Sequence, residues 1–108
     1  MNVLFIVLNE VEHLDDVLDA FVEVGVTGAT ILDSQGMGSI LTNGHKSMKF
    51  YGTILNLLDN ARPYNKTIFT VIEDDKVLED AVNAVKEILD LDKPGVGLMF
   101  SIPVGKVY

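Results

Sequence analysis

The chain has 108 residues, of which 48% are hydrophobic, so we expect one packed domain over residues 1–108 and exclude disorder as its main state. Phosphate backbones bind basic surfaces, and the formal net charge of −8 therefore disfavours nucleic acid as a partner. The absence of cysteine excludes disulfides, thiolate metal ligands and a cysteine nucleophile.

The first predicted element is a strand over residues 3–8, a continuous apolar and largely β-branched run. This run is far shorter than the roughly 20 residues that span a membrane. It also lacks the basic flank of a signal peptide, so we expect a cytoplasmic protein without membrane insertion. The mean hydropathy of +0.30 is high for so small a domain and indicates that a partner chain, most simply another copy, covers some of its apolar surface.

A helix is predicted next, because apolar residues recur at helical spacing with acids between them: Leu14, Val17, Leu18, Phe21 and Val24. Gly25 is placed to end this helix in the left-handed conformation that glycine tolerates. A short strand is expected over residues 29–33.

A long loop is predicted over about residues 35–65, with a short helix or apolar plug at 53–60. Residues 34–58 contain no acid, whereas four of the eight basic residues cluster in this region: Lys46, Lys49, Arg62 and Lys66. This contrast favours an anionic ligand or an acidic partner surface. Lysines that only keep the loop soluble are the alternative.

The second half of the chain repeats the first with a shift of 64 residues, which places Phe5 on Phe69 and Leu14 on Leu78. Its predicted elements are a strand at 67–72, a helix after the acids at 73–75, and a last strand at 97–103. Two such units predict an α+β, ferredoxin-like β-α-β-β-α-β fold, in which two helices cover one face of a four-stranded antiparallel sheet. The other face is expected to be apolar and open.

Few residues indicate chemistry by themselves. His13 and His45 lie far apart and no zinc or EF-hand spacing is present, so we predict no metal site. No serine has an evident base, and we predict no enzymatic activity. Two glycine segments, Gly36-Met37-Gly38 and Gly95-Val96-Gly97, could expose backbone amides to an anion, although ordinary turns have the same pattern.

These segments carry a resemblance to the nitrogen-regulatory PII family, and more closely to its PII-like offshoots. Residues 25–30 (GVTGAT) and the following Gly-Met-Gly are similar to the family's helix end, second strand and the start of its long T-loop. Residues 95–97 and 99–104 (MFSIPV) are similar to its B-loop and last strand.

The resemblance implies a homotrimer that binds an adenine nucleotide (ATP, ADP or AMP) between subunits as an effector, without a required cofactor. It implies signalling through the loop to a transporter or enzyme, with Lys46, Lys49, Tyr51 and Arg62 as docking residues. The ligand-binding residues carried over are Thr30, Gly36, Met37 and Gly38 on one rim and Gly95, Val96 and Gly97 on the other, with Lys66 as a further candidate.

The sequence also departs from the family. Leu98 stands where the B-loop has a lysine, and Ser39-Ile40 stand where an Arg-Gln pair follows the first glycines. The first change removes an expected ionic hydrogen bond to a phosphate, and the second weakens the expectation of 2-oxoglutarate sensing. Two alternatives stay open: a metal-binding trimer resembling the divalent-cation tolerance proteins, in which His13, His45 or the acids would bind copper or zinc, and a small ferredoxin-like enzyme with an enclosed pocket.

Overall fold

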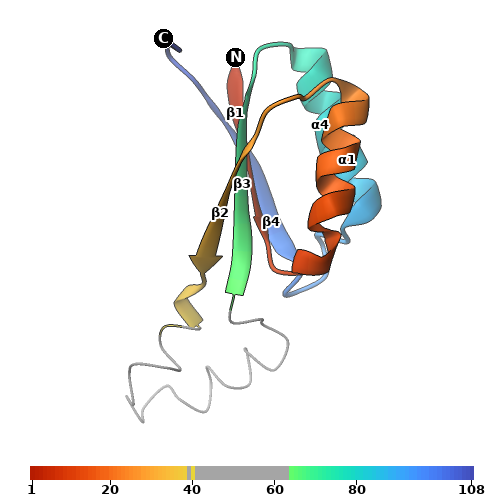
Figure 1. Cartoon of the computed structure of the whole chain (residues 1–108), viewed down its shortest axis with the longest axis vertical. Coiled ribbons are helices and arrows are strands. Elements are labelled where there is room, and N and C mark those ends of the chain that lie inside the picture. Colours follow the sequence, from red (N-terminus) through yellow and green to blue (C-terminus); the bar gives the residue numbers. More distant parts are fainter. Residues whose placement is uncertain (39, 41–63) are drawn as a thin grey trace.

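The computed structural model describes residues 1–38, 40 and 64–108 as a single sheet covered by two helices (Figure 1). The elements are β1 (Asn2–Leu8), η1 (Val11–His13), α1 (Leu14–Val24), β2 (Thr30–Gln35), β3 (Tyr64–Ile72), α4 (Asp75–Ile88) and β4 (Gly97–Pro103). The strand order is β2-β3-β1-β4, and all neighbouring strands are antiparallel. The ferredoxin-like fold predicted from the sequence is confirmed.

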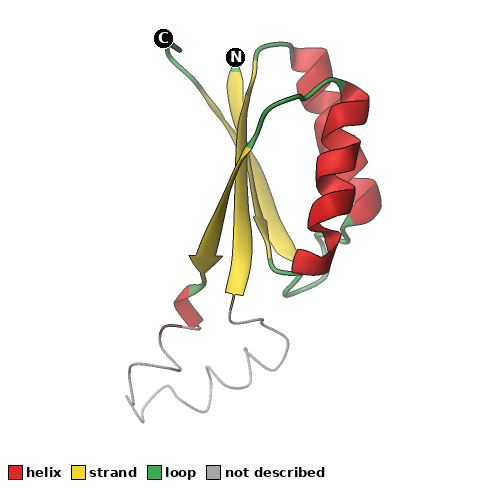
Figure 2. Cartoon of the chain, in the orientation of Figure 1, coloured by secondary structure: helices red, strands yellow, loops and turns green. Residues whose placement is uncertain are grey.

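The core lies between the sheet and the two helices, which share one face of it (Figure 2). Along β1 the side chains alternate, so that Leu4, Ile6 and Leu8 are buried toward the helices. The helices meet them with residues at helical spacing that are also buried: Val17 and Phe21 from α1, and Ala81 and Val85 from α4. The apolar faces of α1 and α4 that the sequence predicts therefore pack against β1 in one core.

The opposite face of the sheet is apolar and uncovered. Phe5 lies at its centre, with its ring centroid 5.1 Å from that of Phe100 and 5.7 Å from that of Phe69. Five large apolar residues that the register places on this face are between 41% and 57% exposed: Leu32, Val71, Leu98, Phe100 and Ile102. Soluble proteins rarely leave a continuous apolar face of this kind in water, so it marks an interaction surface.

The internal repeat has a geometric counterpart at the same place. Phe5 pairs directly with Phe69 in the β1–β3 ladder, and a shift of 64 residues relates these two residues in the sequence. When two repeats form one antiparallel sheet, a residue pairs with its counterpart in the other repeat only where the pseudo-twofold axis that relates the repeats passes through the sheet. The axis therefore passes between these two phenylalanines, and it relates β2 on one edge to β4 on the other.

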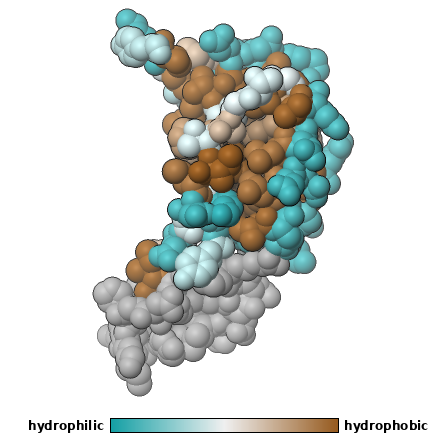
Figure 3. All heavy atoms as spheres, in the orientation of Figure 1, coloured by the Kyte–Doolittle hydropathy of each residue, from teal (hydrophilic) through white to brown (hydrophobic). Residues whose placement is uncertain are grey.

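The helical layer carries most of the charged surface, which is teal in Figure 3, whereas brown apolar residues gather over the sheet. On α4, Lys76 Nζ lies 2.8 Å from Asp80 Oδ1, one turn away. The hydrogen bond to Asp80 raises the pKa of Lys76. None of the helices in the described parts of the chain is long and apolar enough to cross a membrane.

The ends of α1 are where the sequence places them, and Gly25 ends the helix with a φ of 99°. Two strand boundaries differ from the prediction by more than one residue. β2 continues to Gln35, and β3 begins at Tyr64, three residues before the predicted Thr67. The added residues are polar, and pairing between the two strands holds them in the sheet. The segment predicted as a short helix or plug at 53–60 lies outside the described residues.

The start of α4 provides a test of local stability. The Asp74 carboxylate accepts hydrogen bonds from the backbone N–H groups of Lys76 (2.7 Å) and Val77 (3.2 Å). Replacing this cap by alanine is expected to lower the free energy of unfolding by about 1 kcal/mol, measured by urea denaturation. The matched control is Asp75→Ala, which removes the same charge one residue later without removing the cap. Equal shifts in both variants would contradict the capping role.

Candidate functional site

Both glycine segments lie at the same end of the sheet. Asp33, Lys66, Leu8 and Gly97 form a continuous row of paired residues across the four strands near this end. Gly36 directly follows β2, and Gly95 and Val96 directly precede β4, whose first residue is Gly97, so both segments lie at or just beyond the row. In Figure 1 this is the end of the sheet at which β2 stops and β3 begins.

A polar cluster fills this end on the β2–β3 side. Ser34 donates a hydrogen bond to the Asn65 side chain, and its Oγ lies 2.8 Å from Thr67 Oγ1. Asn65, only 6% exposed, donates from Nδ2 to Asn9 Oδ1 at 3.2 Å. Buried amides need such partners, because leaving one unsatisfied costs about 1–3 kcal/mol. The cluster therefore fixes the mutual positions of β1, β2 and β3 at the edge of the site.

Lys66 supplies a positive charge at this end. Its ammonium group forms an ion pair with the Asp33 carboxylate of the neighbouring strand, and its side chain is 33% exposed. Lys66 lies just before the strand predicted to begin at residue 67, but in the structure it belongs to β3 opposite Asp33.

The first predicted rim begins where β2 ends. Residues 37, 38 and 40 are helical, and the Ile40 N–H donates to the Gly36 carbonyl at 3.3 Å. The Met37 side chain is 78% exposed. Thr30 lies at the opposite end of β2, about 17 Å from Gln35 at the usual rise per residue, so only an extended ligand could contact both Thr30 and Gly36.

The second predicted rim precedes β4, and its three residues have different roles. Gly95 has a left-handed φ of 83°, which suits glycine. Val96 is 3% exposed, so its side chain packs in the core and only its backbone could meet a ligand. Its carbonyl already accepts a hydrogen bond from the Asn9 N–H at 3.1 Å. A Cβ atom on Gly97 would lie 2.5 Å from the Val7 carbonyl oxygen, so β4 can approach β1 only with glycine there.

A cavity of about 840 Å³ opens beside the first rim. Its lining combines the Lys66–Asp33 ion pair, polar groups and an aromatic ring, from these residues: Val11, Asp33, Ser34, Gln35, Ile40, Tyr64, Asn65 and Lys66. Such a mixture suits a small molecule with a charged group and a flat apolar part. Sequence reasoning did not select Ser34, Tyr64 or Asn65, and the only available signal was their position at the two ends of the predicted loop.

The two predicted rims do not meet within one chain. They lie on β2 and β4, the two edge strands, and three strand spacings of about 4.8 Å separate these by about 14 Å. The four predicted docking residues, Lys46, Lys49, Tyr51 and Arg62, lie outside the described residues. Apart from Thr30, the predicted ligand-binding residues thus form two predicted half-sites at one end of the sheet.

Comparison with known proteins identifies the family. The model of the family "Nitrogen regulatory protein P-II" matches residues 1–108, so the chain belongs to the P-II family. Among solved structures, the chain is similar to Arabidopsis thaliana PII bound to citrate, with a TM-score of 0.61 and 16% identity over 95% of this chain and 77% of that chain. At this identity the likeness supports the fold. No curated protein shows a significant match.

Proposed function

We propose that the chain is a non-enzymatic regulatory protein that binds a small anionic effector between the subunits of a homotrimer. The first candidate effector is an adenine nucleotide, and no cofactor is required. The proposed site combines Thr30, Gly36, Met37, Gly38 and Lys66 of one subunit with Gly95, Val96 and Gly97 of its neighbour. Membership of the P-II family supports a role in signal transduction.

The observation that supports the proposal is that the two glycine segments adjoin opposite edge strands at the same end of the sheet. A ligand can contact both rims only when β4 of a second copy lies beside β2 of the first. The open apolar face provides a reason for copies to associate, because its exposed residues lie on β2, β3 and β4 and flank the partly buried Phe5 of β1. Packing three such faces around an axis would bury them and bring the edge strands together.

The character of the ligand follows from the charges at the first rim. Lys66 forms its ion pair with Asp33 at a solvent-accessible position. An anion that enters the cavity can therefore compete with the Asp33 carboxylate for the Lys66 ammonium group. The similar PII structure from Arabidopsis is bound to citrate, which is also a small polyanion. Binding at Gly36–Gly38 would act on the loop that begins there, and this loop would dock on a cytoplasmic transporter or enzyme.

Calorimetry with ATP, ADP and AMP, each with and without Mg²⁺, tests the ligand. We expect one nucleotide per chain, and we expect Lys66→Ala to weaken binding about tenfold, since a hydrogen bond to a charged group contributes about 1.5–3 kcal/mol. The control is Lys86→Ala, which removes the same charge from α4. The absence of binding of every nucleotide at millimolar concentration would reject the nucleotide, and equal losses in both variants would reject the role of Lys66.

A further inference from the structure

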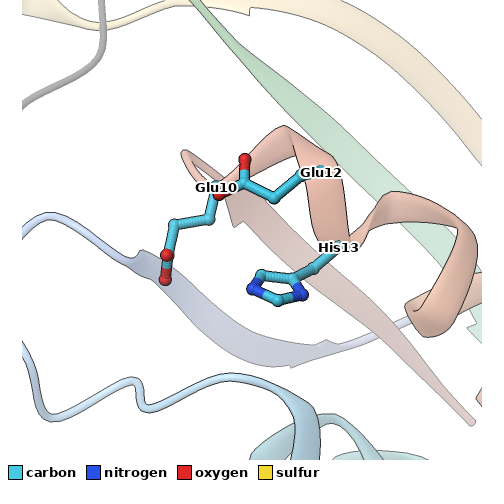
Figure 4. Close-up of side chains that lie close together, drawn as sticks. All are labelled: Glu10, Glu12 and His13. Atoms are coloured by element: carbon cyan, nitrogen blue, oxygen red, sulfur yellow. The ribbon is translucent and has the colours of Figure 1, made fainter.

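Three metal-ligating side chains converge just after β1, outside the residues that the proposed effector would contact. The donor atoms of Glu10, Glu12 and His13 all lie within 4.8 Å of one another. Figure 4 shows the His13 ring and the Glu10 carboxylate on the same side of the short turn, with Glu12 above them. Glu12 is exposed, whereas Glu10 and His13 are partly buried.

The local backbone explains this convergence. η1 is a single 3₁₀ turn, in which side chains three residues apart project in the same direction. The His13 N–H donates to the Glu10 carbonyl at 3.0 Å, and this closes the turn between the two residues. The Asn9 N–H, bonded to the Val96 carbonyl at 3.1 Å, anchors the start of the turn to the residue before β4.

A fourth side chain lies near the imidazole. His13 Nδ1 lies 3.7 Å from Asp16 Oδ2, one turn further along α1. A carboxylate beside one ring nitrogen favours a proton on that nitrogen and leaves the other free to donate its lone pair. Metal-binding histidines commonly have such a carboxylate partner. The His13–Asp16 pair therefore distinguishes this cluster from a group of surface carboxylates alone.

We propose that Glu10, Glu12 and His13 form a binding site for a divalent transition-metal ion, with zinc as the reference ion. One imidazole nitrogen and two carboxylate oxygens are the donor set that such ions accept, whereas Ca²⁺ and Mg²⁺ prefer oxygen alone. Zinc bonds of about 2.0–2.2 Å place tetrahedral ligands about 3.4 Å apart, so a separation within 4.8 Å needs only small side-chain rotations. Water would complete the coordination at the exposed side.

The site would adjoin the effector cavity without sharing its polar groups. Val11, between Glu10 and Glu12, lines that cavity together with Lys66. A bound ion would rigidify this part of the cavity wall. The net charge of −8 and the neighbouring Asp15 and Asp16 would attract cations to this region. The proposal does not depend on nucleotide binding and can be tested without it.

Titration of the full-length metal-free protein with Co²⁺, followed by visible absorption, reports nitrogen and oxygen ligation directly. We expect one Co²⁺ per chain, displaced by one equivalent of Zn²⁺ and not by equimolar Ca²⁺ or Mg²⁺. His13→Gln and Glu10→Gln should each weaken Zn²⁺ binding at least about 100-fold, because each removes a metal ligand. Asp16→Asn should weaken it about tenfold, the lower end of the range for partners of metal ligands.

His45→Gln, which removes the other histidine, and Asp19→Asn, which removes an acid from the same helix, serve as controls with expected wild-type affinity. Circular dichroism of the metal-free variants checks that each is folded, and Glu10→Gln replaces His13→Gln if the latter is not. Three results would overturn the proposal: wild-type affinity in folded His13→Gln or Glu10→Gln, loss of binding in His45→Gln, or displacement of the ion by equimolar Ca²⁺.

Discussion

Replacing Phe100 by aspartate is expected to convert the proposed homotrimer into monomers of 11.8 kDa. Phe100 is 41% exposed in the single chain and stacks on Phe5 at the centre of the open face. If three such faces meet, the substitution buries three unpaired carboxylates, and each burial costs several kcal/mol. The dissociation constant of the assembly should rise by at least about 100-fold, since each 1.4 kcal/mol is a factor of ten. Sedimentation equilibrium at micromolar concentration measures this change.

The matched control is Val22→Asp, which makes the same kind of change at a 65% exposed position on α1. This position lies in the helical layer, so the variant should retain three times the chain mass. Circular dichroism of both variants checks that the monomer remains folded. Two results would reject assembly through the open face: a folded Phe100→Asp variant that remains trimeric, or a wild-type protein that is monomeric.

The second large effect is expected from Gly97→Ala, which adds one methyl group. The new Cβ would lie 2.5 Å from the Val7 carbonyl oxygen, a backbone atom that cannot move without disturbing the β1–β4 pairing. Overpacking usually costs about 1–3 kcal/mol, and a clash with backbone belongs at the upper end, so we expect a loss of about 3 kcal/mol. Chemical denaturation followed by circular dichroism measures this loss.

Gly28→Ala provides the comparison for this prediction. A Cβ at Gly28 meets no atom within 4 Å, and its φ is not in the left-handed region. Its free energy of unfolding should therefore change by less than about 1 kcal/mol. A similar small change in Gly97→Ala would show that β4 can move away from β1 at little cost.

The fold could be predicted from the sequence because each element has its own local signal. The spacing of Leu14 to Val24 and the following Gly25 define α1, and both bounds agree with the structure. The boundaries of β2 and β3 could not be predicted in the same way. The first three residues of β3 are polar or follow a proline, so they carry no strand pattern: Tyr64, Asn65 and Lys66. They belong to the strand because they pair with the end of β2, at Gln35, Ser34 and Asp33. Such pairing joins residues about 30 positions apart, which periodicity does not reveal.

The candidate site could be predicted only in outline. The glycine segments indicate both rims, but the pattern Gly-Val-Gly does not show that Val96 turns its side chain into the core. Of the proposed metal ligands, His13 was named only in the open alternative of a metal-binding trimer, and its grouping with Glu10 and Glu12 was missed for a related reason. His13 was compared with His45 and with zinc spacings on regular helices, whereas the structure brings it to Glu10 through a 3₁₀ turn that has no clear sequence signal. The predictions about Lys46, Lys49, Tyr51 and Arg62 remain predictions.

The position of the chain ends has a practical consequence for experiments on partners. Asn2 pairs with Pro103, and the Val104 N–H donates to the Met1 carbonyl at 3.1 Å, so both termini lie at the end of the sheet opposite the glycine segments (Figure 1). A biosensor chip coupled through the C-terminal residue would hold every molecule in one orientation. Both half-sites would then point into the flowing sample, and no label would be needed near them.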